Sequence, residues 1–286
     1  MQPCEERKIQ LPGFTIGLKI WNPQNTQRVL CLHGKLDNAA SFDLLAPFLP
    51  HLQLVAVDFP GTGLSSPYPK GVLPHWKNDA FLMLHLIKEL NWNRFDIIAH
   101  SLGSLSASII AIACPDQVNK LVYLDILGPR IDFIEKGTTY LLTDIDNFIN
   151  HTKFPRTIFQ DLESAIQKRM KSGNISYQAS QALALRGTTK SKEGYVWTFD
   201  RRLRSVASTL PYEDELRTLF NEIVAPVCLI RAKQGVPYPE KIFQERAQSL
   251  KNLMIHELPG GHHIHMDDPK PVGKTIAEFL KLKDNF

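Results

Sequence analysis

The sequence of 286 residues predicts an α/β fold in which a mostly parallel sheet carries helices on both faces. Short apolar runs rich in Val, Ile and Leu recur along the chain, as they do in strands buried on both faces of a parallel sheet. Amphipathic segments lie between the runs, and this alternation is typical of α/β proteins. The length also suffices for one large core domain that carries an insertion.

Six apolar runs are predicted to be strands of this sheet. In chain order they are VLCL (29–32), LQLVAVD (52–58), FDIIA (95–99), KLVYLDIL (120–127), VCLIRA (227–232) and LMIHEL (253–258). The run FTIGLKIW (14–21) alternates in polarity and is predicted to be an antiparallel strand at the edge of the sheet. Residues 75–90 repeat apolar side chains at helical spacing, and 269–282 has the pattern of a closing helix.

The interval 128–224 contains no run of the buried-strand type. Amphipathic segments such as RTIFQDLESAIQKRM fill it, with a candidate hairpin at GYVWTFD. We therefore expect a core domain formed by 1–127 and 225–286, with 128–224 as a mainly helical cap. Its aromatic side chains are expected to pack mostly between helices, and some of them alternatively line an apolar pocket. These residues are Phe133, Tyr140, Phe148, Phe154, Phe159, Tyr177 and Trp197.

Composition and charge argue against several classes of protein. The net charge is +4, but Lys and Arg never form a run of five or six, which argues against a nucleic-acid partner. The four cysteines form no CxxC pair and no zinc spacing, so they are expected to be reduced core residues. The N-terminal segment is charged, and no stretch approaches the about 18 apolar residues of a membrane span. The expected compartment is the cytoplasm, and no cofactor is predicted.

The stretch FDIIAHSLGS places Ser101 between an apolar strand and a predicted helix. A serine hydroxyl is a weak nucleophile at neutral pH unless a base and oxyanion donors are held beside it. In the motif G-x-S-x-G, small residues two positions either side of the serine allow a sharp turn that exposes the hydroxyl. Here Ala99 replaces the first glycine, and Gly103 is the second. A purely structural turn is the alternative, but the strand and helix context favours a nucleophile.

Two further turns follow predicted strands. In CLHGKLDN, the backbone is predicted to face the serine, with the N–H groups of Lys35 and Leu102 as oxyanion donors. The His33 side chain is expected to bond to nearby backbone. In DFPGTGLSS, Asp58 is expected to fix the turn through hydrogen bonds to backbone N–H groups, rather than to act as a catalytic acid.

Three histidines, His262, His263 and His265, follow the last predicted strand. Together with Asp267 and Asp268 they are one conceivable metal site, but no usual ligand spacing accompanies them. A catalytic base on a glycine-hinged loop is the favoured interpretation, because the serine requires a base. No metal is predicted.

These segments resemble the α/β-hydrolase superfamily and, more narrowly, its serine hydrolase-like proteins. The resemblance extends along nearly the whole chain through HGKLDNAASFD, VAVDFPGTGLSS, LNWNRFDIIAHSLG, NKLVYLDIL, RGTT and ELPGGHHIHMDDP. It implies an eight-stranded, mostly parallel sheet, a nucleophile elbow after the fifth strand and a cap inserted after the sixth. It also implies a triad in the order Ser, acid, His, with Ser101 as nucleophile and His262 as base. His265 is then expected to pack or cap at the entrance to the final helix.

The acid is where this sequence departs from the commonest pattern of the superfamily. The usual position after the seventh strand is occupied by Lys-Gln-Gly (233–235), which offers no carboxylate. The alternative position follows the sixth strand, and Asp125 occupies it, so Asp125 is the preferred acid. Glu213, Asp214 and Glu215 near the end of the cap are fallbacks, and a missing acid is the third alternative.

The predicted function is a serine hydrolase that cleaves an ester or related acyl bond of a small, partly apolar molecule. Ser101 attacks the acyl carbonyl, His262 accepts the proton, Asp125 orients the imidazole, and water then releases the acyl group. Two alternatives are a small-molecule binder without turnover, and the same triad used for acyl transfer or on a carbon–carbon bond. If the Lys35 side chain faces the pocket rather than solvent, it favours an acidic acyl or leaving group. The sequence predicts neither the substrate nor the oligomeric state.

Overall fold

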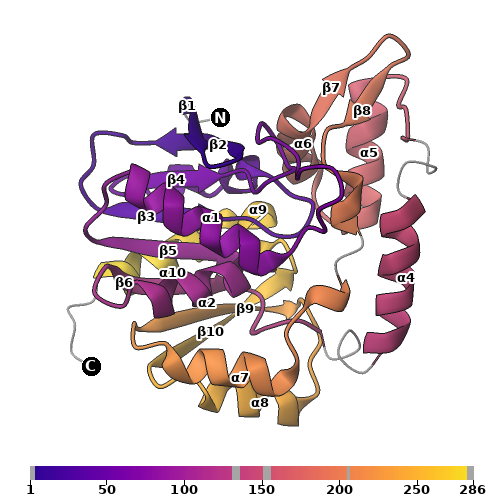
Figure 1. Ribbon diagram of the computed structural model, residues 1–286. Coiled ribbons are helices and arrows are strands. Elements are labelled where there is room, and N and C mark those ends of the chain that lie inside the picture. The colour runs from indigo at the N-terminus through magenta and orange to yellow at the C-terminus, as the bar shows by residue number, and fades with distance from the viewer. Residues whose placement is uncertain (1–3, 131–135, 151–155, 205–206, 282–286) are drawn as a thin grey trace.

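The computed structural model describes residues 4–130, 136–150, 156–204 and 207–281. Eight strands form its central sheet: β1 (Glu5–Leu11), β2 (Phe14–Trp21), β3 (Arg28–Leu32), β4 (Gln53–Val57), β5 (Phe95–His100), β6 (Val118–Leu124), β9 (Val227–Gln234) and β10 (Leu253–Gly261). Their order is β1-β2-β4-β3-β5-β6-β9-β10 (Figure 1). Every neighbouring pair from β4 to β10 is parallel, which confirms the predicted fold class.

The edge of the sheet is β1, so the prediction of an edge strand at 14–21 was wrong. β2 lies between β1 and β4 and is antiparallel to both. The sequence EERKIQL of β1 carries polar side chains on both faces and is mostly exposed. It therefore lacks the alternation that indicates a half-buried strand. The second position in the sheet explains why β2 is buried from Ile16 to its end.

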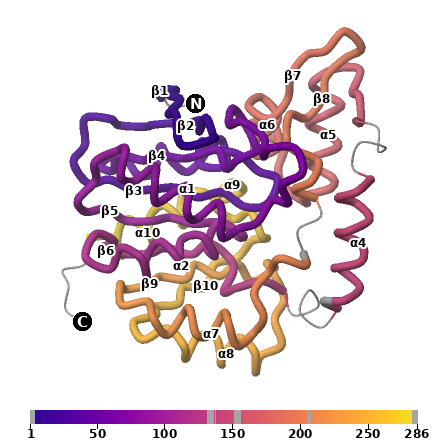
Figure 2. The backbone as a smooth tube through the Cα atoms, viewed as in Figure 1, coloured from indigo at the N-terminus to yellow at the C-terminus, as the bar shows by residue number. Residues whose placement is uncertain are grey.

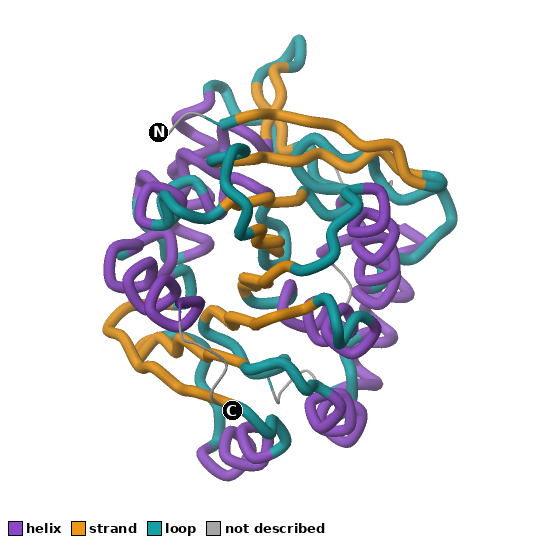
Figure 3. Tube along the Cα trace, turned by 90° about the vertical axis from the view of Figure 1, so that its left-hand side faces the viewer, coloured by secondary structure: helices purple, strands orange, loops and turns teal. Residues whose placement is uncertain are grey.

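Helices cover both faces of the sheet, as the side view in Figure 3 shows. One face packs against α1 (Trp76–Glu89), α2 (Gly103–Ala113), α7 (Glu213–Glu222) and α8 (Glu240–Gln248). The other face packs against α10 (Pro269–Lys281) and the 3-10 helix η1 (Ala39–Phe42). All four cysteines are free thiols, with Cys31 and Cys228 buried in strands. Among the described residues, no helix has the length and apolar character needed to cross a bilayer.

Most of the chain between β6 and β9 stands to one side of the sheet (Figure 2). It contains α4 (Gly137–Asn150), α5 (Leu162–Gly173), α6 (Tyr177–Gly187), β7 (Thr188–Lys190), β8 (Tyr195–Trp197) and the 3-10 helices η3 (Arg201–Arg204) and η4 (Ala207–Thr209). The last helix before β9 is α7, which packs on α2 of the core. The cap boundaries at 128 and 224 stay a prediction. Phe133 and Phe154 lie outside the described residues.

A buried ion pair joins α6 to the turn after β4. Arg186 Nη2 lies 2.9 Å from Asp58 Oδ2, and the two side chains are 6% and 0% exposed. Asp58 also accepts the backbone N–H groups of Ala39 and Leu64, each at 2.8 Å, so it fixes the turn as predicted. Gly63 has a φ of +48°, and a Cβ there would lie 2.2 Å from Asp58 Oδ1. Only glycine therefore fits this turn.

We expect Arg186→Gln to lower the free energy of unfolding by about 3 kcal/mol, because it leaves the buried Asp58 carboxylate without its cationic partner. Urea denaturation near pH 7 measures the change. Lys190→Gln is the control, since Lys190 is an exposed cation at the end of β7. A loss below about 1 kcal/mol, the size typical of exposed ion pairs, would contradict the expected effect.

Candidate active site

Ser101 occupies the sharp turn between β5 and α2. Its φ is +49°, in the left-handed region where residues other than glycine are strained. The backbone passes closely behind it, because a Cβ at Gly103 would lie 2.6 Å from the carbonyl oxygen of Leu32. Ala99, which replaces the first glycine of the motif, is fully buried in the apolar core. The predicted strand-to-helix turn is thus present, with the serine at its apex.

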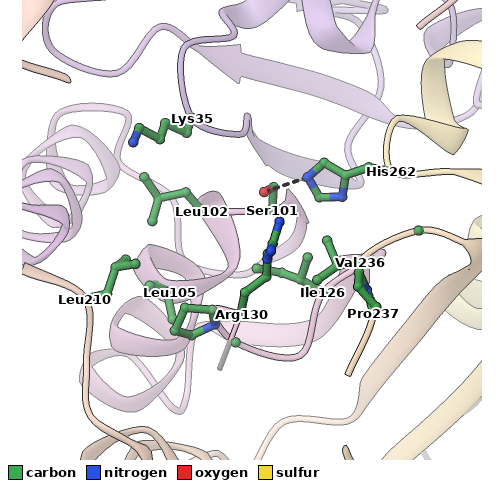
Figure 4. Close-up of a pocket in the computed structure, with 13 residues that line it drawn as sticks. Lys35, Ser101, Leu102, Leu105, Ile126, Arg130, Leu210, Val236, Pro237 and His262 are labelled. Carbon is green, nitrogen blue, oxygen red and sulfur yellow. Dashed lines mark hydrogen bonds between the residues drawn. The ribbon is translucent and has the colours of Figure 1, made fainter. Parts of the chain in front are cut away.

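Ser101, His262 and Asp125 form one continuous chain of hydrogen bonds (Figure 4 draws the first link). Ser101 Oγ lies 2.9 Å from His262 Nε2. On the other side of the ring, His262 Nδ1 lies 2.6 Å from Asp125 Oδ2. A carboxylate oxygen accepts, so Nδ1–H donates to Asp125 and leaves the lone pair of Nε2 facing the serine hydroxyl. This arrangement is the one that activates a serine.

Asp125 is the residue that directly follows β6, and its φ is +66°. Its Oδ1 accepts the N–H of Ala232 and its Oδ2 accepts the N–H of Val236, both at 3.0 Å. These donors belong to β9 and the turn after it, next to β6 in the sheet. A Cβ at Gly235 would lie 1.9 Å from Asp125 Oδ1. The missing side chain at the usual acid position therefore leaves room for the Asp125 carboxylate.

Gln234, the residue before Gly235, supports the loop that carries His262. Gln234 Oε1 accepts the backbone N–H of Gly260 at 2.7 Å, two residues before His262.

The three fallback acids all lie on α7, where Glu213 pairs with Arg246 and Glu215 with Lys77. Within the described part of the chain, none of the three bonds to His262.

The two predicted oxyanion donors line the same cavity as Ser101 and His262. Among the described residues, neither the Lys35 nor the Leu102 backbone N–H donates a hydrogen bond. Unpaired donors beside a nucleophile are available to an oxyanion that forms there. A Cβ at Gly34 would lie 3.0 Å from Ser101 Cβ, so the turn that carries Lys35 passes against the serine. The oxyanion role stays a prediction.

The cavity beside Ser101 has a volume of about 380 Å³, within the range of small-molecule sites. Its lining is mostly apolar (Figure 4): the apolar side chains are Leu102, Leu105, Ile126, Pro129, Leu210, Val236 and Pro237. Lys35 and Arg130 are its charged residues, and among the described residues no carboxylate lines it. The Lys35 Nζ donates to the Arg204 carbonyl at 2.9 Å, so this side chain turns toward the cap.

The other histidines of the loop have partners of their own. His263 Nε2 lies 3.3 Å from Asp37 Oδ2. His265 is fully buried and bonds to a hydroxyl of η1, which confirms its packing role. The one group of potential metal ligands in the described chain is Asp37, His100 and His263, whose ligand atoms lie within 4.8 Å of one another. Arg169 Nη2 lies 2.6 Å from Asp37 Oδ1 and already compensates this carboxylate.

His100, which directly precedes Ser101, holds the loop of His262 in place. The His100 Nε2–H donates to the carbonyl oxygen of His262 at 2.9 Å. Burial lowers the pKa of His100 to about 3, so its ring is neutral near pH 7. The sequence pattern does not indicate this role of His100, because its place in G-x-S-x-G is a variable one. The side chain of His33 behaves as predicted, with Nδ1 2.7 Å from the carbonyl oxygen of Gly34.

Comparison with known proteins places the chain in a family. Residues 29–275 match the model of the alpha/beta hydrolase family. The chain belongs to this family. It is 32% identical to serine hydrolase-like protein 2 of Homo sapiens, over 96% of this chain and 94% of that protein. It is 28% identical to a probable serine hydrolase of Drosophila melanogaster, over 97% of this chain and 88% of that protein.

Solved structures agree with this assignment. A hypothetical protein of Pseudomonas aeruginosa PAO1 superposes with a TM-score of 0.86 at 30% identity, covering 97% of this chain and all of that one. The thioesterase domain from the curacin biosynthetic pathway superposes with a TM-score of 0.86 at 22% identity and the same coverage, which shows a common fold. The predicted resemblance to serine hydrolase-like proteins is confirmed, and the chain belongs to the hydrolase class.

We expect Gly235→Ala to slow fluorophosphonate labelling of Ser101 by at least about 100-fold, because the new methyl group displaces the Asp125 carboxylate from His262. Gly261→Ala is the matched control. A Cβ at Gly261 meets no atom within 4 Å, although the residue adjoins His262. Equal labelling rates in the two variants would show that the Asp125 contact does not activate the serine.

We expect His100→Asn to reduce the sensitivity of stability to acid. The unfolded chain takes up a proton on this histidine below pH about 6.5, whereas the folded chain does so only near pH 3, so stability falls as the pH falls between these values. Between pH 7 and pH 5 the free energy of unfolding should drop by about 1 to 2 kcal/mol less in the variant than in the wild type. Urea denaturation at both pH values measures this, with exposed His51→Asn as control, and parallel pH profiles would contradict it.

Proposed function

We propose that this protein is a serine hydrolase that cleaves an ester or a related acyl bond of a small, partly apolar molecule. The observation that carries the proposal is the unbroken hydrogen-bond chain from Ser101 through His262 to Asp125. This chain ends at the wall of a mainly apolar cavity of about 380 Å³. A serine with an oriented base at such a cavity is suited to covalent acyl chemistry.

In the proposed reaction, Ser101 Oγ attacks the acyl carbonyl carbon while its proton passes to His262 Nε2. Asp125 stabilises the resulting imidazolium through Nδ1–H, and the N–H groups of Lys35 and Leu102 donate to the oxyanion. The tetrahedral intermediate collapses when His262 gives the proton to the leaving group, which leaves an acyl ester on Ser101. His262 then takes a proton from water as the water oxygen attacks the acyl carbon. When the bond from that carbon to Ser101 Oγ breaks, His262 returns the proton to Oγ and the carboxylic acid departs.

The protein holds these groups in place before any substrate binds. Two backbone N–H groups fix the Asp125 carboxylate, and His100 and Gln234 fix the loop of His262 from two sides. Dipoles and donors that are already oriented need not reorganise when charge develops in the transition state. This rigidity supports catalysis rather than mere binding.

We expect Ser101→Ala, His262→Ala and Asp125→Asn each to lower turnover of 4-nitrophenyl butyrate by at least about 1,000-fold. Removal of the nucleophile or the base abolishes the covalent route, and an amide at position 125 favours the wrong tautomer of the imidazole. Release of 4-nitrophenolate measures the rate, and Ser104→Ala, in the same elbow, is the control. Undiminished activity in Ser101→Ala would exclude the proposed mechanism.

The alternatives have a distinct experimental signature. If no acyl ester of a broad panel is hydrolysed, and a fluorophosphonate leaves Ser101 unmodified while a known serine hydrolase reacts beside it, the fold serves binding without turnover. If added alcohol captures most of the acyl group, the protein is an acyl transferase rather than a hydrolase. Mass spectrometry of the labelled peptide and of the products separates these cases.

A further inference from the structure

A second cavity of about 360 Å³ lies between the cap and the turn after β3. Its walls come from α5 and the chain before it, from β8 and the chain after it, from η3 and from the turn at Lys35. Four cationic residues line it: Lys35, Lys168, Arg169 and Arg204. No carboxylate among the described residues lines it. The cavity therefore concentrates positive charge at one place, although the net charge of the whole chain is only +4.

The protein neutralises only part of this charge. Arg169 forms a buried ion pair with Asp37, with Nη2 and Oδ1 2.6 Å apart. In the described part of the chain, the other three cations of the cavity form no ion pair. Asp144 attracts Lys35 electrostatically but does not line the cavity. An anion that enters meets Lys168 and Arg204, two exposed cations that form no ion pair among the described residues and whose positive charge attracts it.

The remaining walls suit an organic anion. Three aromatic side chains line the cavity, namely Phe159, Trp197 and Phe199. The Arg204 guanidinium lies 5.1 Å from the centre of the Phe199 ring, which holds this charge at the wall. The hydroxyl-bearing residues Thr157 and Ser172 are also part of the lining. Hydroxyls and cations bind oxyanions, while aromatic faces cover the attached hydrocarbon.

Lys35 lies between this cavity and the one beside Ser101, because it lines both. Its ammonium donates to the Arg204 carbonyl at 2.9 Å, at the side of the second cavity. Its backbone N–H is the proposed oxyanion donor at the side of the first. The cavity beside Ser101 is likewise lined by cations and, among the described residues, by no carboxylate. Both cavities thus have the charge that complements an anionic compound.

We propose that the second cavity is a subsite for an oxyanion, a carboxylate or a phosphate, carried by the substrate away from the bond that is cleaved. The substrate class is then an anionic acyl compound, with its acyl carbon at Ser101 and its charged group near Lys168 and Arg204. This inference rests on the proposed function, because it assumes that Ser101 is the nucleophile. It assigns the cap cavity a role in substrate selection.

Direct binding tests the subsite without turnover. Trp197 is half-buried in the cavity wall, whereas Trp21, Trp76 and Trp92 are buried in the core. Octanedioate and inorganic phosphate, titrated separately into Ser101→Ala, should give a saturable change in tryptophan fluorescence that Trp197→Phe abolishes. A response to one probe alone identifies the oxyanion as carboxylate or phosphate. No saturable response to either probe would overturn the proposal.

Charge variants locate the binding. Lys168→Gln and Arg204→Gln should each weaken probe binding about tenfold, because each removes a charge-assisted contact. Lys171→Gln is the matched control, since Lys171 lies on the same helix as Lys168 but lines neither cavity. An equal loss of affinity in the control would show a general effect of surface charge and would contradict a specific subsite.

Kinetics separates failure of the subsite from failure of the proposed function. The mono-4-nitrophenyl ester of octanedioic acid should have a KM about tenfold lower than its methyl-capped diester, and Lys168→Gln should bring the two KM values together. If both esters are hydrolysed through Ser101 with equal KM in the wild type, the subsite is wrong and the hydrolase proposal stands. If the probes bind but neither ester is turned over, the subsite stands and the hydrolase proposal fails.

Discussion

The Asp125 carboxylate is the point on which the geometry of the site depends. A buried carboxylate is costly unless hydrogen bonds or charges satisfy it, and here two backbone N–H groups and the His262 ring do so. Those two N–H groups belong to β9 and the turn that follows it, so the carboxylate fastens the end of β6 to its neighbour in the sheet. The histidine loop meets the same carboxylate from β10. Three adjacent strand ends therefore converge on one side chain, and the space it occupies requires glycine at position 235.

The helices α5 and α6 contact the core through a small apolar cluster and through two ion pairs, and not through the sheet. Arg186 of α6 reaches the buried Asp58, and Arg169 of α5 reaches the buried Asp37. Asp37 also contacts His263, the residue next to His262. A group bound in the second cavity would touch Arg169, because this residue is part of its lining. Helix α5 thus lines the second cavity and, through Asp37, is linked to the loop that carries His262.

Much of this structure follows from local signals in the sequence. Apolar runs indicated the parallel strands because such strands are buried on both faces. The elbow around Ser101 was predictable because it needs small residues on both sides of the serine, next to a strand and a helix. The edge strand β1 was not predictable in this way, because it carries polar side chains on both faces. Ion pairs such as that of Arg186 with Asp58 could not be predicted from the sequence either, since 128 residues separate the partners.

The choice of Asp125 as the acid of the triad shows why the sequence alone left several candidates for this role. The sequence places Asp125 at a strand end, but only the fold brings β6 and β9 side by side and shows that Gly235 makes room for the carboxylate. Likewise, His100 lies at a variable position of the motif, and its bond to the His262 carbonyl depends on a contact across 162 residues. Long-range register decides these contacts, and no local pattern encodes it.

The most direct test is detection of the acylated serine. A hindered ester, 4-nitrophenyl trimethylacetate, slows deacylation and allows the covalent intermediate to accumulate. Rapid quenching followed by peptide mass spectrometry should find one trimethylacetyl group on Ser101, formed together with one equivalent of 4-nitrophenolate per molecule of protein. Release of 4-nitrophenolate with the acyl group on another residue, or on none, would contradict the account.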